Sequence, residues 1–490
     1  MSGPRESLHL EQRNMSEQDT GTALHRDAIG VAHIVFFVVA AAAPLAVVVG
    51  VTPFAFSAGN GAGLPLTFLL VGAMYVLFSV GFVAMSGRMR RAISFYPYIS
   101  AGLGRAAGVG SALISIVSYV AVELMATALF GIFASGNAEQ YLGIDSPWWA
   151  WSTLVALAVL PCGVRHVEFS GRVLGALLFA EVTILAILGL AILLAGGGPD
   201  GVVLRPFGAQ ALVSGNLSVG LVFVVSAFIG FEATCIFGEE AREPRKTIPL
   251  ATYLAVIVIA GFYSFSTWVV ALDYGAGRIA AAAGADPTHL YQASIERHLG
   301  KAVGVALQAL MLTSTFACVL SFHNTVNRYL YVVSRERILP AWLARTHPRF
   351  RSPYVAGLVQ SAGFIVAVLA LGLGGAAPDS VVGLASAFSS VGILVIQILV
   401  SLAVVFYFRR NPQEVGAWRG LVAPALSAVT LSVCLYLMTS NLALLSGSDS
   451  AWVQAYPFLV GAIGLSGVLI AAWLRANKPH FYQQLGCLDV

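Results

Sequence analysis

The sequence predicts an all-α integral membrane protein with twelve transmembrane helices. Of its 490 residues, 58% are hydrophobic and 10% are charged, whereas an ordinary globular chain has roughly 25% charged residues. Residues 28–87 contain no Asp, Glu, Lys or Arg, although about 20 apolar residues are enough for one membrane crossing. This composition excludes a soluble enzyme, a nucleic-acid-binding protein and a secreted domain held by disulfides.

Twelve long apolar runs, separated by Gly, Pro and charged residues, define the predicted helices. Each run is predicted as a helix because lipid offers no hydrogen-bond partner to the backbone, which must therefore be satisfied within the segment. In chain order the runs are 30–57, 65–86, 107–136, 147–164, 169–196, 212–238, 247–272, 302–334, 353–374, 380–408, 420–444 and 452–474.

The Lys and Arg residues divide unequally between the two ends of these helices. With twelve crossings, 23 of the 27 basic residues fall on the side of the two termini, and the other side has Arg205, Arg278, Arg297 and Lys301. Basic residues are retained on the cytoplasmic side of a membrane. We therefore expect a multi-pass protein of the cytoplasmic membrane, with cytosolic tails over residues 1–28 and 476–490.

Two of the predicted helices are interrupted near their middle. In the first, Pro44 follows a run of Ala residues, and a proline removes one N–H and clashes with the carbonyl four residues earlier. In the sixth, Gly230 lies close to Glu232 within an apolar span. Each interruption falls in the first helix of a five-helix set. Paired interruptions of this kind indicate the substrate site of a secondary transporter, and the alternative is a simple kink in each helix.

An interrupted helix exposes peptide groups that carry partial charge. The free N–H groups at the start of a half-helix suit a carboxylate, and the free C=O groups at an end suit an ammonium group or a cation. An amino acid carries both charges. Two interrupted helices that face each other can therefore hold one without the help of a charged side chain.

The sixth segment also carries a recognisable motif. Phe228-Ile229-Gly230-Phe231-Glu232 is followed by Glu239-Glu240 and by Glu243-Pro244-Arg245-Lys246-Thr247-Ile248-Pro249. This run resembles the sixth-helix signature of the amino acid–polyamine–organocation (APC) superfamily of permeases. Weaker similarities are Phe95-Tyr96-Pro97-Tyr98 after the second helix and Asn327-Arg328-Tyr329-Leu330 near the end of the eighth. The resemblance covers roughly residues 30–475.

The resemblance implies the leucine-transporter fold, in which two inverted repeats of five helices form a transport core. Here the core is residues 29–408, with repeats at about 29–198 and 210–408, and helices 11 and 12 lie within 409–475. Substrate is then expected between the interruptions of helices 1 and 6, flanked by helices 3, 8 and 10. The expected substrate-binding residues are Ala43, Pro44, Leu45, Ala46, Val47, Ser226, Ala227, Phe228, Ile229 and Gly230.

The first interruption departs from the family pattern. Family members usually carry a short Gly-Ser-Gly-like run there, whereas this chain has Ala42-Ala43-Pro44-Leu45-Ala46. Because Pro44 has no N–H, we expect Leu45, Ala46 and Val47 to supply the donors for a substrate carboxylate.

Three glutamates lie in the middle of predicted helices, where a charged residue is costly and is by default functional. Glu232 is the first candidate for proton coupling, and the alternative is a hydrogen bond to free N–H groups of its own helix. Glu181 lies near the position where some relatives have a lysine in place of a coupling sodium, and the alternative is a polar contact between helices. Glu123 is, like Glu232 and Glu181, a candidate for proton coupling or gating, and it could face the substrate. The alternative is that it packs on a polar face of another helix. His33 and His323 are expected to be core histidines, and the alternative is that they carry protons.

Three buried carboxylates favour the proton as the coupling ion, although hydroxyls of Thr313, Ser314 and Thr315 could supply oxygens to sodium. We expect an amino acid or related amine as the substrate, and no cofactor, metal site or nucleic-acid partner; the five cysteines are scattered without a C-x-x-C pair.

Symport and exchange both remain open as mechanisms. The alternatives of another class are a channel or a substrate sensor on the same scaffold, and an intramembrane enzyme, for which no catalytic motif is present.

Overall fold

The computed structural model describes residues 30–86, 95–165, 171–232, 234, 243–350, 352–440 and 454–486. In these ranges the regular structure is helical, apart from one isolated bridge between Gly198 and Gly201. Short 3-10 or π segments are marked η. The first half contains α2 (Val31–Ala41), η2 (Ala46–Val51), α3 (Thr52–Ala58), η3 (Gly61–Gly63), α4 (Leu64–Ser86), α5 (Phe95–Leu103), α6 (Arg105–Leu142), α7 (Trp148–Arg165), α8 (Gly171–Leu194), η4 (Arg205–Phe207), α9 (Ala209–Leu212) and α10 (Leu217–Phe228).

The second half continues with helices that are on average longer. They are α11 (Pro244–Tyr274), α12 (Ile279–Ala285), α13 (Leu290–Leu299), α14 (Lys301–Arg335), η6 (Ala341–Ala344), α15 (Tyr354–Leu373), α16 (Pro378–Arg410), η7 (Trp418–Val422), α17 (Ala423–Thr439), α19 (Tyr456–Asn477) and α20 (Pro479–Gln484).

Nine helices in the described ranges are long and apolar enough to cross a membrane. Three shorter apolar helices, Ala46–Ala58, Trp148–Val164 and Leu217–Phe228, lie where the first, fourth and sixth segments were predicted. Two of the three are short because their segments are interrupted. The all-helical, multi-pass architecture is thus confirmed, while twelve crossings and the five-plus-five repeat stay predictions.

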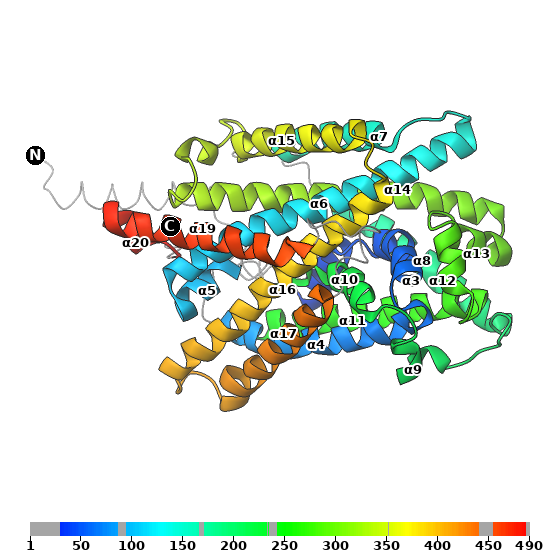
Figure 1. The fold of residues 1–490 in the computed structure, drawn as a ribbon, viewed down its shortest axis with the longest axis horizontal. Helices are drawn as coiled ribbons and strands as arrows, with labels where there is room; N and C mark the ends of the chain where they lie inside the picture. The colour runs from blue at the N-terminus through cyan, green and yellow to red at the C-terminus, as the bar shows by residue number, and fades with distance from the viewer. Residues whose placement is uncertain are drawn as a thin grey trace, which may run out of the picture.

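The long helices α6, α14 and α16 form the middle of the bundle, and α6 packs on both of the others (Figure 1). Small residues permit this close approach. A Cβ added to Gly392 of α16 would lie 2.0 Å from Ser118 Oγ of α6, and one added to Gly467 of α19 would lie 2.7 Å from the Cα of Gly110. Small side chains at such contacts let helix backbones pack closely where lipid provides no hydrophobic driving force.

Two short helices, α12 and α13, cover one end of the bundle between α11 and α14. α12 packs on α3, and α13 packs on α14 and α8, at the right of Figure 1. The charge distribution predicts that this end faces away from the cytoplasm. We refer to it as the outer end, and to the opposite end, where α14 and α16 finish, as the inner end.

Candidate functional site

The first membrane segment is interrupted directly before Pro44. α2 ends at Ala41, and Ala43 has a φ of 45°, a left-handed conformation that a residue with a side chain rarely adopts. The chain then becomes helical again, and residues 46–51 form a π-helix. Ala42 to Gly50 are all buried. The segment therefore contains a true break, enclosed by the other helices.

Side chains of two other helices, α8 and α11, bond to this break, and a third helix, α14, bonds to one of them. Glu181 Oε2 of α8 accepts the Leu45 N–H at 3.4 Å and the Ser314 hydroxyl of α14 at 3.0 Å. Tyr263 of α11 donates its hydroxyl to the Ala42 carbonyl at 3.3 Å. Val47 donates its N–H to the Ala43 carbonyl at 3.1 Å. Two of the three N–H groups expected to receive a substrate carboxylate are thus engaged within the protein.

The second break follows α10, which ends at Phe228. Ile229 is extended, with a ψ of 128°, and Gly230 has a φ of 113°, which only glycine adopts without strain. The carboxylate of Glu232 turns back toward the break. Its Oε2 accepts the Gly230 N–H at 3.0 Å, and its Oε1 accepts the Tyr119 hydroxyl of α6 at 2.5 Å. Glu232 therefore binds a free N–H of its own interrupted helix and connects it to α6.

The side chains around the second break point in different directions. The rings of Phe228 and Phe231 pack on Tyr75 of α4, with centroids 5.1 Å and 5.0 Å apart. Ser226 donates its hydroxyl to the Phe223 carbonyl at 2.8 Å. Ala227 and Ile229 are buried with 2% and 3% of their surface exposed. The expected residue Phe228 thus contributes to an aromatic cluster with α4.

The two breaks belong to one region of the molecule. The π segment η2 packs on α10 as well as on α6, α11 and α14. A Cβ added to Gly50 in η2 would lie 2.6 Å from Met311 Cε of α14 and 3.4 Å from Leu129 Cδ1 of α6. Helices α6, α10, α11 and α14 therefore all contact the segment that follows the first break.

Glu123 has a different set of partners. Its Oε1 lies 3.1 Å from His323 Nδ1 of α14, and its Oε2 accepts the Gln360 Nε2–H of α15 at 2.6 Å. Both Glu123 and His323 are 2% exposed. The structure thus joins Glu123 to helices α14 and α15, whereas Glu181 and Glu232 are bonded to the breaks.

Comparison with known proteins shows the family of the chain. A family model described as "Amino acid permease" matches residues 33–484. The chain belongs to the amino acid permease family. The predicted resemblance to the APC superfamily is thereby confirmed, and the protein is a multi-pass membrane transporter of amino acids rather than an enzyme.

The permease is also similar to several bacterial transporters. It is 28% identical to an uncharacterised transporter of Mycobacterium tuberculosis over 70% of this chain and 72% of the relative. It is 24% identical to the methylthioribose transporter of Bacillus subtilis over 78% and 81% of the two chains. It is 26% identical to the branched-chain amino acid permease of the same organism over 50% and 48%.

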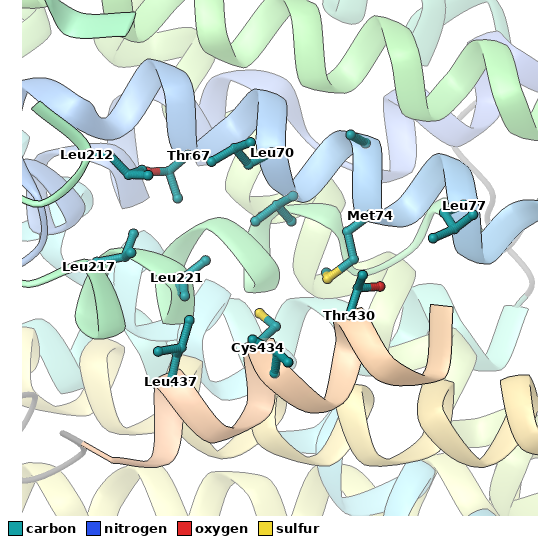
Figure 2. A pocket seen from close by; sticks show the side chains of 13 residues that line it. Thr67, Leu70, Met74, Leu77, Leu212, Leu217, Leu221, Thr430, Cys434 and Leu437 are labelled. Atoms are coloured by element: carbon teal, nitrogen blue, oxygen red, sulfur yellow. The ribbon is translucent and has the colours of Figure 1, made fainter. Parts of the chain in front are cut away.

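The permease has a separate apolar groove between α4, α10 and α17 (Figure 2), with a volume of about 500 Å³. Its wall is formed by side chains such as Leu70, Met74, Leu221, Cys434 and Leu437. An amino acid needs a polar partner for each of its two charged groups. This groove offers almost none, so it does not suit the substrate of a permease.

The hydroxyls considered for sodium are mostly bonded within their own helix. Thr313 and Thr315 of α14 donate to the carbonyls of Leu310 and Met311 at 2.9 Å and 2.8 Å, while Ser314 donates to Glu181. Among the described residues, no group of three or more His, Cys, Asp or Glu side chains gathers as a metal site would require. The geometry around the first break is that of a carboxylate held by two donors.

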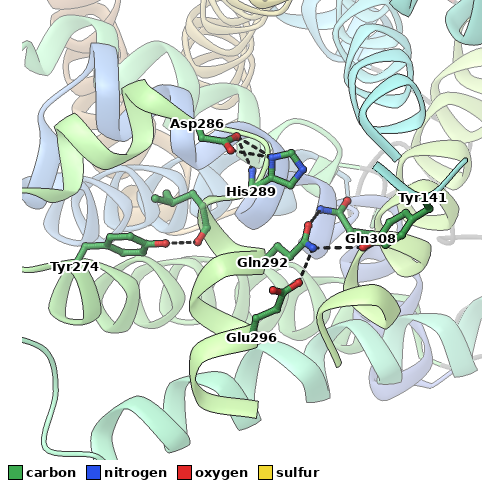
Figure 3. A network of polar contacts seen from close by, with 8 residues as sticks. Tyr141, Tyr274, Asp286, His289, Gln292, Glu296 and Gln308 are labelled. Carbon is green, nitrogen blue, oxygen red and sulfur yellow. Dashed lines mark hydrogen bonds and ion pairs between the residues drawn. The ribbon is translucent and has the colours of Figure 1, made fainter. Parts of the chain in front are cut away.

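A polar network fastens α13 of the permease to neighbouring helices at the outer end (Figure 3). Tyr274 of α11 donates its hydroxyl to the Leu290 carbonyl at 2.7 Å. Gln292 Nε2 donates to Glu296 Oε1 at 2.7 Å, and Gln292 Oε1 accepts the Gln308 Nε2–H of α14 at 2.5 Å. The Tyr274 bond holds α13 against α11, and the Gln308 bond holds it against α14.

Asp273 at the end of α11 completes the attachment of α13. Its Oδ2 accepts the Ser294 hydroxyl at 2.7 Å and Arg297 Nη1–H at 2.9 Å, and its Oδ1 lies 2.9 Å from His298 Nε2. The adjacent Tyr291 shares a hydrogen bond of 2.9 Å with Thr52 of α3. The outer half of the first segment is therefore tied to α13.

Sequence reasoning missed four of these polar residues, namely Tyr119, Tyr263, Asp273 and Gln360. Each lies in a span that is otherwise apolar, and a polar group in such a span usually finds a partner on a neighbouring helix. For Gln360 and Asp273 the polar side chain itself gave this signal in the sequence. For the two tyrosines it was weak, because their rings also fit an apolar helix.

Several predicted features lie outside the described residues or side chains. They are Glu239 and Glu240 of the motif, two of the five cysteines (Cys235 and Cys487), the predicted cytosolic tail over residues 1–28, and the side chains of His33 and Arg245. Of the charged cluster after the sixth segment, Glu243 and Lys246 form an exposed ion pair at 2.6 Å.

Proposed function

We propose that the permease moves an amino acid or a related amine across the cytoplasmic membrane by alternating access, with a proton as the coupled ion. The observation that carries the proposal is the pair of helix breaks, each held by a buried or partly buried glutamate. In this proposal the ten helices of residues 29–408 form two inverted repeats, helices 11 and 12 follow them, and both termini are cytoplasmic; each break then lies in the first helix of its repeat.

The substrate carboxylate binds at the N–H groups that follow the first break, in this proposal. Glu181 occupies the Leu45 N–H at 3.4 Å, longer than a normal hydrogen bond. A negatively charged Glu181 repels an incoming carboxylate and competes with it for Leu45, whereas a protonated Glu181 does neither. Proton binding and substrate binding therefore favour each other, which is the linkage that symport requires.

Glu232 acts at the second break in the same scheme. Its carboxylate neutralises the partial positive charge of the Gly230 N–H and accepts the Tyr119 hydroxyl. Loss of the negative charge weakens both bonds and frees the chain at the break to move relative to α6. Glu232 thus connects the protonation state of the site to the position of the sixth segment.

The residues at the breaks favour a substrate with an apolar side chain. Ala43, Ala46, Val47, Ala227 and Ile229 carry no polar side-chain group. Glu123, which would have suited an amino or guanidino side chain, is bonded to His323 and Gln360. One relative is named a branched-chain amino acid permease, which supports leucine as the first substrate to test.

The experiment is uptake of labelled amino acids and amines into proteoliposomes, with an imposed proton gradient, an imposed sodium gradient, or preloaded substrate. We expect leucine or a similar apolar amino acid to accumulate when the outside is more acidic than the inside. Accumulation with the sodium gradient alone would overturn proton coupling. Transport that occurs only with preloaded substrate would establish an exchanger.

A further inference from the structure

Glu123 and His323 form a buried pair between α6, α14 and α15. Glu123 is the charged side chain that faces His323 among the described residues, and its second oxygen accepts the neutral Gln360 amide. On the α7 side His323 meets Gly163, where an added Cβ would lie 3.2 Å from Nε2. Cys318 is a buried thiol on α14, five residues before His323. The site is closed to bulk solvent.

The pair can accept a proton without new contacts. When His323 is neutral, its Nδ1–H donates to Glu123, and Nε2 is an acceptor that has no hydrogen-bond partner in the described structure. A proton added to the pair converts it either to an imidazolium paired with a carboxylate or to a neutral carboxyl beside a neutral imidazole. In either form the two side chains keep their mutual hydrogen bond, so one proton can be bound and released.

A row of buried polar atoms leads from His323 toward the inner end of α14. Asn327 and Ser334 follow His323 by four and eleven residues, so all three side chains lie on one face of a helix with 3.6 residues per turn. Asn327 is 5% exposed and Ser334 is 0% exposed. Asn327 Oδ1 and Ser334 Oγ, like His323 Nε2, have no hydrogen-bond partner in the described structure.

Ordered water is the usual partner of such atoms. Buried polar groups are almost always hydrogen-bonded, and internal waters serve those that no protein group reaches. At 1.5 Å per residue, the eleven residues from His323 to Ser334 span roughly 16 Å, which is about half of a bilayer core. Asn327 packs directly on Gly357 of α15, because a Cβ there would lie only 3.2 Å from Asn327 Nδ2.

We propose that Glu123 and His323 bind a proton, and that this proton exchanges with the inner side through water held by Asn327 and Ser334. The site is separate in its contacts from the two breaks. Its role in coupling rests on the proposed transport function, whereas the binding and exchange of the proton do not.

Infrared pH titration of the purified protein, without substrate, tests the binding site. We expect a carboxyl signal that titrates in the wild type, is lost in Glu123→Gln, and moves to a different pH in His323→Gln. Glu181→Gln and Glu232→Gln are the matched controls and should retain the signal. If His323→Gln does not yield folded protein, Gln360→Leu removes the other donor to Glu123 and should also move the titration. A set of titrating signals that is unchanged in Glu123→Gln would overturn the proposal.

The exchange route is tested by following the same signal after a rapid pH change. We expect Asn327→Leu and Ser334→Ala to slow proton exchange at Glu123 by about tenfold or more, because each removes a polar group that holds water. Gln308→Leu, which removes a buried amide from the outer half of α14, should leave the rate unchanged. Equal rates in all three variants and the wild type would exclude this route. Neither test uses transport, so failure of the transport proposal is recognised separately in the uptake assay.

Discussion

At the scale of single residues, the three intramembrane glutamates of the permease differ in what they bind. Glu181 joins the first break to α14, Glu232 joins the second break to α6, and Glu123 pairs with His323. The sequence placed all three in mid-span but could not distinguish them. Their partners on other helices lie between 113 and 237 residues away in the chain, so only the packing of the helices decides which contacts form.

Replacing Glu181 by Gln should separate coupling from substrate binding. The amide keeps a hydrogen-bond partner for Ser314 but carries no charge and takes up no proton. We expect uptake driven by a proton gradient to fall at least about tenfold, while exchange of internal for external leucine continues. Ser314→Ala, which leaves the carboxylate in place, serves as the control. Full gradient-driven uptake by Glu181→Gln would remove Glu181 from the mechanism.

Replacing Glu232 by Gln should abolish gradient-driven uptake while folded protein still reaches the membrane. Tyr119→Phe removes one of the two hydrogen bonds to the carboxylate, worth about 1 kcal/mol or a factor of roughly five, and should reduce uptake less. The comparison uses initial rates of leucine uptake normalised to folded protein. Undiminished transport driven by a pH gradient in Glu232→Gln would contradict the assigned role.

At the scale of elements, the decisive features are the two breaks and the helices that close them. Pro44 and Gly230 signalled both breaks in the sequence, because each residue opposes a regular helix at its position. The left-handed conformation of Ala43 and the π segment that follows Leu45 were not predictable, since alanine favours an α-helix on its own. The neighbours of the break, including Tyr263, impose this local structure.

Pro44→Ala tests the first break as a binding element. The substitution restores an N–H and removes the clash that interrupts the helix, so the peptide groups after Ala43 should become less available to a carboxylate. We expect a clearly weaker apparent affinity for leucine, measured as a higher KM for uptake. Pro161→Ala in α7, a proline inside another apolar helix, is a matched control. An unchanged KM in Pro44→Ala would favour a mere kink.

The C-terminal helix α20 should dock more firmly at acid pH. Glu336, just past α14, accepts the Tyr96 hydroxyl and the Gly486 N–H, and burial raises the pKa of its carboxyl above the ordinary value. The folded state therefore prefers the protonated form, and the stability from this group is lost as pH rises through the raised pKa. Hydrogen exchange of residues 479–486, corrected for intrinsic rates, should be slower at low pH. Exchange that does not depend on pH, or that keeps the same dependence in Glu336→Gln, would contradict this.

At the scale of the whole molecule, composition and charge predicted the class of protein well. Nine of the predicted segments coincide with helices long enough to cross a membrane, because hydropathy alone marks them. The outer helices α12 and α13 were not predicted. α12 is an Ala-rich run of only seven residues, and α13 is a polar helix held by contacts such as Asp273 with Arg297. Contacts between particular side chains, and the identity of the substrate, produce no periodic pattern of hydrophobic residues in a single sequence.

The contacts of Asp273 should stabilise the docking of α13 at the outer end. Asp273→Asn removes the buried negative charge that contacts Ser294, Arg297 and His298. The side chains of Arg297 and His298 then lose their acidic partner. We expect faster hydrogen exchange over residues 290–299, with a smaller effect from Asp286→Asn, which breaks only an exposed contact to His289. Equal exchange in the two variants would show that Asp273 does not anchor this helix.

The central claim is that substrate binding at the breaks requires protonation of Glu181. Calorimetric titration of the purified protein with leucine, in buffers of different ionisation enthalpy, measures the protons taken up on binding. The account predicts net proton uptake by the wild type near neutral pH and less uptake, with binding retained, in Glu181→Gln. Binding with no proton uptake, or with the same uptake in both proteins, would contradict it.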